Sequence, residues 1–174
     1  MTMITQPDRL TTDLSARRFG DVRDLLPDVD NPTPLVRLNQ TLGERGLDLY
    51  LKLEWLNPFG SVKDRTAAYL IAGLARRGLL DGKELVEASS GNTAIALAAL
   101  ASLAGTRLTT TIPEGVPKET KVILRMLGAE VWETPDELCP VDNPKDGAIA
   151  LARALAASES GRRYAATRQY ESQD

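Results

Sequence analysis

Segments with the pattern of β-strands alternate with segments of helical spacing along most of the chain, and this alternation constrains the fold more than any other feature. Three expected helices end before Gly78, Gly105 and Gly128, and a fourth is expected to begin with Asn143 as its cap and Pro144 in its first turn. A helix precedes or follows each expected strand, and the strands cover residues 84–88, 107–112, 130–133 and 162–167. The sequence therefore predicts an α/β fold, with a parallel sheet covered by helices on both faces in three layers (αβα).

The N-terminal part of the chain has a different character. Residues 1–33 are polar and acidic and contain Pro27 and Pro32, so we expect a loosely ordered arm there. Two short apolar segments follow, at 34–38 and 47–53. The leucines of the second segment alternate with other residues, which predicts a half-buried strand.

The chain contains no histidine and a single cysteine, Cys139, and this composition removes several classes of site. Ser-His-Asp triads, Cys-His dyads and zinc sites built on imidazole or paired thiolates are excluded, and no metal site is expected. A single cysteine forms no internal disulfide, which fits a reducing cytoplasm. The net charge is -3, and the longest apolar run, over 94–104, is far shorter than the roughly 20 residues that span a bilayer. We therefore expect a soluble cytoplasmic protein that binds neither nucleic acid nor membranes.

Lys63 lies in a polar segment, residues 57–65, that leads into the first expected helix. At the start of a helix, the positive end of the dipole and the loss of water both disfavour a charged ammonium group. A neutral amine is the better nucleophile toward an aldehyde, as Schiff-base chemistry requires. The alternative is an ordinary surface lysine, with Asp64 as a charge complement to the helix N-terminus.

A second polar turn connects an expected strand to the next helix and consists of Ser89, Ser90, Gly91, Asn92 and Thr93. Small residues allow close backbone approach, and successive N–H groups at a helix N-terminus bind a carboxylate or a phosphate. The same residue types are equally typical of an ordinary helix cap. The chain has neither G-x-G-x-x-G nor G-x-x-x-x-G-K-[ST], so dinucleotide and Walker-type sites are disfavoured.

In this order and spacing, the polar segments resemble the N-terminal part of the fold-type-II pyridoxal-phosphate (PLP) enzymes, specifically the cysteine synthases. Lys63 and Asn92 are 29 residues apart (92 minus 63), close to the separation between the Schiff-base lysine and the asparagine beside the cofactor in that family. The resemblance extends from Asn31 to Tyr170, and residues 52–59 are most similar to the branch that uses O-acetylserine or O-phosphoserine. The matching segments are residues 31–35, 51–54, 57–65, 89–93 and 127–131.

The resemblance implies a role for each matched residue. Lys63 would form a Schiff base with PLP and later move protons at the substrate Cα. Asn92 would form a hydrogen bond with the ring hydroxyl of the cofactor, and Gln169 would reach the substrate carboxylate. That carboxylate would be held mainly by the turn of Ser89, Ser90, Gly91, Asn92 and Thr93. The implied reaction is a β-replacement that forms L-cysteine from O-acetylserine or O-phosphoserine and a sulfur donor.

Two departures from the family pattern bear on this function. Ser89 stands where the family usually has threonine, a change that keeps the hydroxyl. Family members are considerably longer, and their second half carries the loop that binds the cofactor phosphate. We therefore expect the isolated chain to bind PLP poorly, to associate as a homodimer, or to need a separate C-terminal half. The implied organisation is a polar arm (1–33), strands of a larger cofactor domain (34–62), a small α/β domain (63–168) and a truncated return to the larger domain (169–174).

Two other functions are compatible with the same residues. A serine or threonine dehydratase-type PLP lyase would share the lysine and the carboxylate-binding turn. A non-catalytic pseudoenzyme would keep the small α/β domain as a binding module for a protein partner or an amino-acid carboxylate. Attachment of PLP at Lys63 would separate an enzyme from such a module. An unrelated nucleotide-binding domain is opposed by the absence of phosphate-binding motifs.

Overall fold

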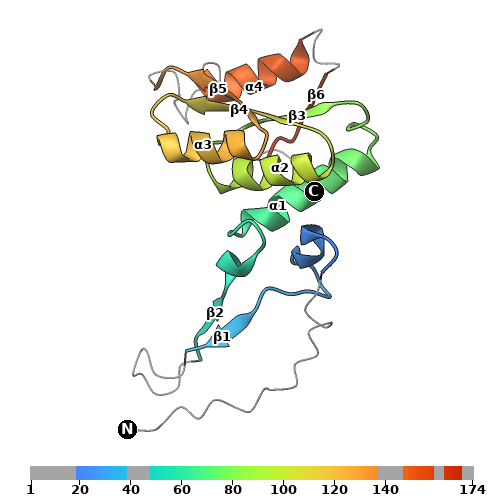
Figure 1. The fold of residues 1–174 in the computed structure, drawn as a ribbon, viewed down its shortest axis with the longest axis vertical. Coiled ribbons are helices and arrows are strands. Elements are labelled where there is room, and N and C mark those ends of the chain that lie inside the picture. Colours follow the sequence, from blue (N-terminus) through green and yellow to red (C-terminus); the bar gives the residue numbers. More distant parts are fainter. Residues whose placement is uncertain (1–18, 39–47, 137–146, 159–162, 170–174) are drawn as a thin grey trace.

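The computed structural model describes residues 19–38, 48–136, 147–158 and 163–169 of the chain (Figure 1). Its main sheet contains four parallel strands in the order β5-β4-β3-β6. Each strand lies within two residues of its expected position. The bounds are β3 (Glu84–Ala88), β4 (Leu108–Pro113), β5 (Glu130–Thr134) and β6 (Tyr164–Ala166).

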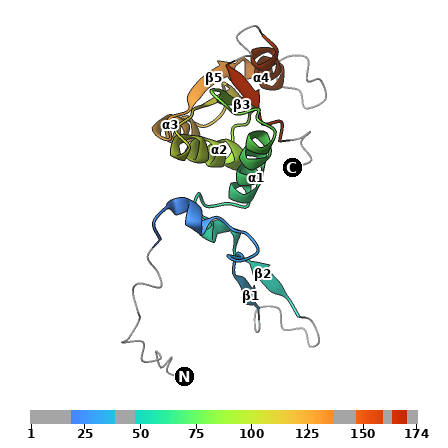
Figure 2. The same cartoon turned by 90° about the vertical axis from the view of Figure 1, so that its right-hand side faces the viewer.

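Helices cover both faces of this sheet. Three of them lie on one face, α1 (Lys63–Arg76), α2 (Asn92–Leu103) and α3 (Lys118–Met126), and α4 (Gly147–Ala157) lies on the other (Figures 1 and 2). The predicted three-layer α/β fold is therefore confirmed. None of the helices in the described ranges is long and apolar enough to cross a bilayer.

Glycine ends three of these helices as expected. Gly78, Gly105 and Gly128 have φ angles of +64°, +71° and +85°, a conformation that residues with a Cβ rarely adopt. The chain therefore turns away from the helix axis and returns to the sheet within a few residues. The expected start of the last helix, at Asn143 and Pro144, lies outside the described residues.

The alternation of side chains along the strands separates two hydrophobic clusters. Leu85 belongs to the cluster that packs with α1, α2 and α3, whereas its neighbour Val86 packs on the α4 side with Tyr164. Helix α2 lies against α1 and the sheet, and most of its residues are buried, including Leu97 at 0% exposure. Its alanines allow this close approach, so α2 is a buried helix rather than an amphipathic one.

The N-terminal strands form a separate hairpin. β1 (Leu35–Arg37) pairs in antiparallel fashion with β2 (Tyr50–Lys52), and neither strand joins the four-stranded sheet (Figure 2). The strand predicted over 47–53 is confirmed but is shorter, because β2 covers only three of these residues. On its leucine face, Leu49 and Leu53 are half-buried, whereas Leu51 is 44% exposed.

Part of the predicted polar arm is folded. Residues 22–25 form a 3-10 helix whose N-cap, Asp21, accepts a hydrogen bond from the backbone N–H of Arg23, while Asp24 bonds back to the N-cap N–H. Leu26 then packs against the main hydrophobic cluster. The acidic residues that indicated a loose arm therefore serve here as caps, and residues 1–18 lie outside the described part of the chain.

Candidate active site

Two candidate segments meet at the carboxyl edge of the main sheet. β3 and β6 are parallel neighbours with Val86 opposite Ala166, so the residues that follow each strand emerge at the same edge. The 89–93 turn follows β3, and Gln169 follows β6. Ligands of open α/β sheets bind at this edge. Two of the three predicted site segments, which are far apart in sequence, are therefore neighbours in the fold.

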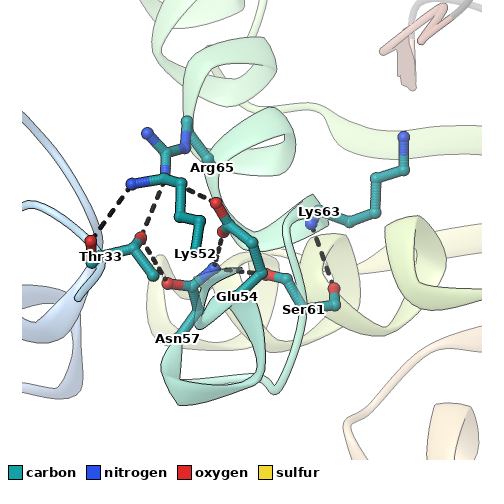
Figure 3. A network of polar contacts seen from close by, with 7 residues as sticks. All are labelled: Thr33, Lys52, Glu54, Asn57, Ser61, Lys63 and Arg65. Carbon is teal, nitrogen blue, oxygen red and sulfur yellow. Dashed lines mark hydrogen bonds and ion pairs between the residues drawn. The ribbon is translucent and has the colours of Figure 1, made fainter. Parts of the chain in front are cut away.

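Lys63, the third candidate, is the first residue of α1. The connection from α1 to β3 and the connection from β3 to α2 are both short, so α1 and α2 begin at the same end of β3. Its backbone N–H donates to Ser61 Oγ at 3.1 Å. The side chain is directed away from the polar network around Thr33 and Arg65 (Figure 3). Its Nζ forms no hydrogen bond or ion pair with the described residues.

The loop before Lys63 is held by a buried carboxylate. Asp64 is 0% exposed, and its Oδ2 accepts the backbone N–H of Phe59 at 2.5 Å. Its Oδ1 accepts a hydrogen bond from Ser61 Oγ at 3.3 Å. Burial raises the pKa of Asp64 above its ordinary value, although both hydrogen bonds act in the opposite direction. Asp64 therefore closes the 59–64 loop from within, and it also lies in the first turn of α1, where the surface-lysine alternative placed it as a charge complement.

A polar network braces the same loop from outside (Figure 3). Asn57 Nδ2 donates to the carbonyl oxygen of Ser61 and to Glu54 Oε2, both at 2.8 Å. Arg65 Nη2 donates to Thr33 Oγ1 at 3.0 Å and lies 3.5 Å from Glu54 Oε1.

The network also reaches the N-terminal hairpin. Thr33 Oγ1 donates to Asn57 Oδ1 at 3.2 Å, and Lys52 Nζ donates to the carbonyl oxygen of Thr33 at 3.2 Å. Three segments that the sequence matched as separate motifs thus form one support for the start of α1. Sequence reasoning placed these residues in the motifs but assigned them no role.

The 89–93 turn carries open hydrogen-bonding groups. The N-cap of α2 is Gly91, and it forms no side-chain capping bond. The side chains of Ser89, Ser90 and Asn92 form no hydrogen bond with other described residues. These residues therefore do not act as the ordinary helix cap that the sequence left as an alternative. The first N–H groups of α2 remain available, and Thr93, at 4% exposure, is the least accessible side chain of the turn.

Gly91 has space beside it that the chain does not fill. Its φ of -117° is accessible to any residue, so the backbone does not require glycine. A Cβ at this position would meet nothing within 4 Å, so packing within the chain does not require glycine either. The open space and the free N–H groups suit an anionic ligand that approaches the backbone closely.

Gln169 is tied to a carboxylate that sequence reasoning missed. Its backbone N–H donates to Glu87 Oε2 at 3.2 Å, and Thr167 Oγ1 donates to the same oxygen. Glu87 is 5% exposed, and burial raises the pKa of its carboxyl group, while the bonds from Thr167 and Gln169 lower it. A charged residue between apolar neighbours in an expected strand was the sequence signal that could have identified it.

A metal does not account for these groups within the described part of the chain. There, no cluster of three or more histidine, cysteine or acidic side chains is arranged to bind one. Cys139 lies outside the described residues.

A parallel sheet with an open helix N-terminus at its carboxyl edge is the arrangement that α/β domains use to bind anionic small molecules. Lys63, whose Nζ has no partner among the described residues, lies at the start of a helix that begins at the same edge. Comparison with known families agrees with this class. The model of the pyridoxal-phosphate dependent enzymes matches residues 26–174, and the chain belongs to that family.

Individual relatives point to one branch of the family. The chain is 42% identical to a probable cysteine synthase of Bacillus subtilis over 130 residues, which are 74% of this chain and 40% of the relative. It is 41% identical to cysteine synthase B of Salmonella typhimurium, again over 130 residues, or 74% of this chain and 41% of the relative. Homology to the cysteine synthases is therefore established.

Solved structures share the fold. An O-ureido-L-serine synthase superposes on this chain with a TM-score of 0.75 at 30% sequence identity. The superposition covers 89% of this chain and 45% of that enzyme. A cysteine synthase of Entamoeba histolytica gives a TM-score of 0.74 at 26% identity and covers 96% of this chain and 46% of its own. The chain thus spans less than half the length of these relatives.

Proposed function

We propose that the chain takes part in a PLP-dependent β-replacement that forms L-cysteine from O-acetylserine or O-phosphoserine and a sulfur donor. The observation that carries this proposal is the uncapped N-terminus of α2, which follows the same sheet edge as Gln169. An amino-acid substrate presents a carboxylate, and open N–H groups at a helix N-terminus bind one without a cation. The names of the relatives support the choice of reaction.

Lys63 is proposed to hold the cofactor and to move the proton at the substrate Cα. Its Nζ forms no bond with the described residues, so no internal partner has to be displaced before it reacts. PLP, when bound, supplies the electron withdrawal that stabilises negative charge at Cα. The brace formed by Asp64 and Asn57 orders the loop before Lys63, and an ordered loop keeps the amine in reach of the reacting carbon.

The 89–93 turn is proposed to orient the substrate. Ser89, Ser90 and the backbone at Gly91 would hold the carboxylate, with a smaller contribution from the buried Thr93. Asn92 is exposed at the first position of α2 and would meet the ring hydroxyl of the cofactor. Gln169 would approach the carboxylate from the β6 side. Fixing the carboxylate on two sides orients the Cα–H bond for Lys63.

The first test is attachment of PLP to the purified chain. PLP is titrated while its visible absorbance is followed, borohydride then makes the linkage permanent, and peptide mass mapping locates the modified lysine. Lys118 offers a matched control, because it is the first residue of α3 as Lys63 is of α1. We expect saturable modification at Lys63, abolished by Lys63→Ala and unchanged by Lys118→Ala. Equal labelling of the two lysines would refute a built cofactor site.

Turnover is tested separately from attachment, because the chain spans 40% to 46% of the length of its relatives. The PLP-loaded chain is assayed for cysteine with O-acetylserine and with O-phosphoserine in the presence of sulfide. A 2-oxo acid without cysteine would support the dehydratase-type alternative. Attachment without any product would support a requirement for a partner half or a second copy. Failure of attachment would leave the family membership unchanged and would support either a requirement for a separate C-terminal half or the pseudoenzyme alternative.

A further inference from the structure

Glu87 is a buried acid that connects two strands beyond their last ladder pair. Its carboxylate accepts the hydroxyl of Thr167 and the backbone N–H of Gln169 through the same oxygen. Glu87 and Thr167 are 5% and 3% exposed. Burial of a carboxylate is costly unless hydrogen bonds compensate it, so this arrangement persists only because the donors are in place.

Pairing of the two strands does not explain this arrangement. β3 and β6 already pair from Glu84 opposite Tyr164 to Val86 opposite Ala166, and the N–H of Thr167 donates to the Val86 carbonyl at 3.2 Å. The bond to Gln169 lies past the end of this ladder. It holds a segment that would otherwise leave the sheet without further backbone pairing.

The backbone between the two donors is in an unfavourable conformation. Arg168 has a φ of +53°, and among the described residues it is the one non-glycine residue with positive φ. A residue with a Cβ adopts this conformation at a cost of roughly 1–2 kcal/mol unless its surroundings impose it. Thr167 and Gln169, on either side, both donate to Glu87, so the buried carboxylate imposes this turn.

The 89–93 turn, on the other side of the candidate site, is also held beside Glu87. Thr110 of β4 lies opposite Glu87 in the ladder, and its hydroxyl donates to the Ser89 carbonyl at 2.7 Å. The 89–93 turn and the 167–169 segment are therefore both held by hydrogen bonds at the level of Glu87 in the sheet.

We propose that Glu87 is a positioning residue: its buried carboxylate fixes Gln169 beside the 89–93 turn, so that the two sides can grip one amino-acid carboxylate. This inference rests on the proposed function for its substrate and on the contacts of Glu87 for its geometry. Loss of the carboxylate is expected to weaken amino-acid binding while leaving attachment of PLP at Lys63 intact, because Lys63 is held by the separate 59–64 loop.

The experiment compares Glu87→Met with Glu84→Met. Met keeps the length of the side chain and removes both acceptor oxygens. Glu84 is a matched control, because it lies on the same strand and also bonds to the β6 segment, through an ion pair with Arg163 at 3.0 Å, but at the other end of the ladder. The first readout is amide hydrogen exchange of Gln169 by NMR, which needs neither cofactor nor activity. We expect exchange about tenfold or more faster in Glu87→Met and unchanged in Glu84→Met. Equal protection in Glu87→Met and the wild type would overturn the proposal.

The second readout is the apparent Kd of the PLP-loaded chain for O-acetylserine. Glu87→Met should raise this Kd about tenfold or more, whereas the fraction of Lys63 modified by PLP should stay at the wild-type level. An unchanged Kd would overturn the positioning role. If the wild-type chain binds no O-acetylserine, the proposed function fails instead, and the Gln169 exchange still decides whether Glu87 holds the segment.

Thr167 supplies variants that disturb the fold less. Thr167→Val removes one donor to Glu87 and keeps the side-chain shape, whereas Thr167→Ser keeps the hydroxyl. We expect Thr167→Val to shift both readouts in the direction of Glu87→Met by a smaller factor, and Thr167→Ser to keep wild-type values. Wild-type behaviour of Thr167→Val together with a severe loss of folded structure in Glu87→Met, by circular dichroism, would mark Glu87 as merely structural.

Discussion

Replacement of Asp64 tests the loop before Lys63 most directly. Asp64→Ala would leave the partly buried N–H of Phe59 without its acceptor and would remove the partner of Ser61 Oγ. An unsatisfied buried donor costs about 1–3 kcal/mol, and a lost bond to a charged group adds to this, so we expect a loss of about 2–4 kcal/mol in the free energy of unfolding. Asp64→Asn should stay within about 1 kcal/mol of the wild type, because its amide oxygen still accepts from Phe59 and its NH2 donates to Ser61.

Urea unfolding followed by circular dichroism measures both variants against the wild type. The slope of the unfolding free energy with urea should be unchanged, so the difference appears as a shift of the midpoint. An Asp64→Ala variant as stable as the wild type would refute the conclusion that the hydrogen bonds of Asp64 stabilise the 59–64 loop. An Asp64→Asn variant as unstable as Asp64→Ala would show that the charge, rather than the acceptor, is what the loop requires.

Three further predictions concern glycine conformation, core packing and the buried Glu87. Gly105→Ala should lose about 1 kcal/mol or more of unfolding free energy, because the φ of Gly105 is +71°. Gly91→Ala should leave the unfolding free energy nearly unchanged but weaken O-acetylserine binding, because the added Cβ fills only the open space beside the turn. Leu97→Ala should lose about 2–5 kcal/mol, because Leu97 is fully buried between α2 and its neighbours; a loss below about 1 kcal/mol would contradict this core position. Burial raises the pKa of Glu87, so the folded chain retains a proton that the unfolded chain releases. The free energy of unfolding should therefore fall as the pH rises from about 4.5 through the raised pKa. Urea midpoints measured across this range should fall less steeply in Glu87→Gln, which has no carboxyl group to titrate.

Much of the fold could be predicted because its signals are local. The period of apolar residues distinguishes strands from helices, and glycines such as Gly105 end helices through a conformation that their own residue type permits. The order of strands and helices then restricts the topology to a parallel sheet with helices on both faces. The length and burial of β2 could not be predicted in this way, because alternation of leucines does not reveal whether another layer covers the strand.

The site was predictable in its residue types and less so in its contacts. Lys63 and the 89–93 turn were identified from their positions at helix N-termini, and the family motifs supported them. At that turn the structure disfavours an ordinary helix cap, because Gly91 caps α2 without any side-chain bond, and the ligand cradle stays a prediction. The burial of Asp64 inside the loop could not be predicted, because burial depends on what packs over a residue and not on its neighbours in sequence.

The sequence by itself determined the order of the elements, the family and the candidate residues, since these depend on short-range periodicity and on motifs. Only the tertiary structure decided which candidates share one edge of the sheet and what holds them there. Glu87 meets Thr167 and Gln169, 80 and 82 positions later in the chain, because β3 and β6 pair in parallel at one register. Register follows from the packing of the whole core, and no local preference of Glu87 encodes it.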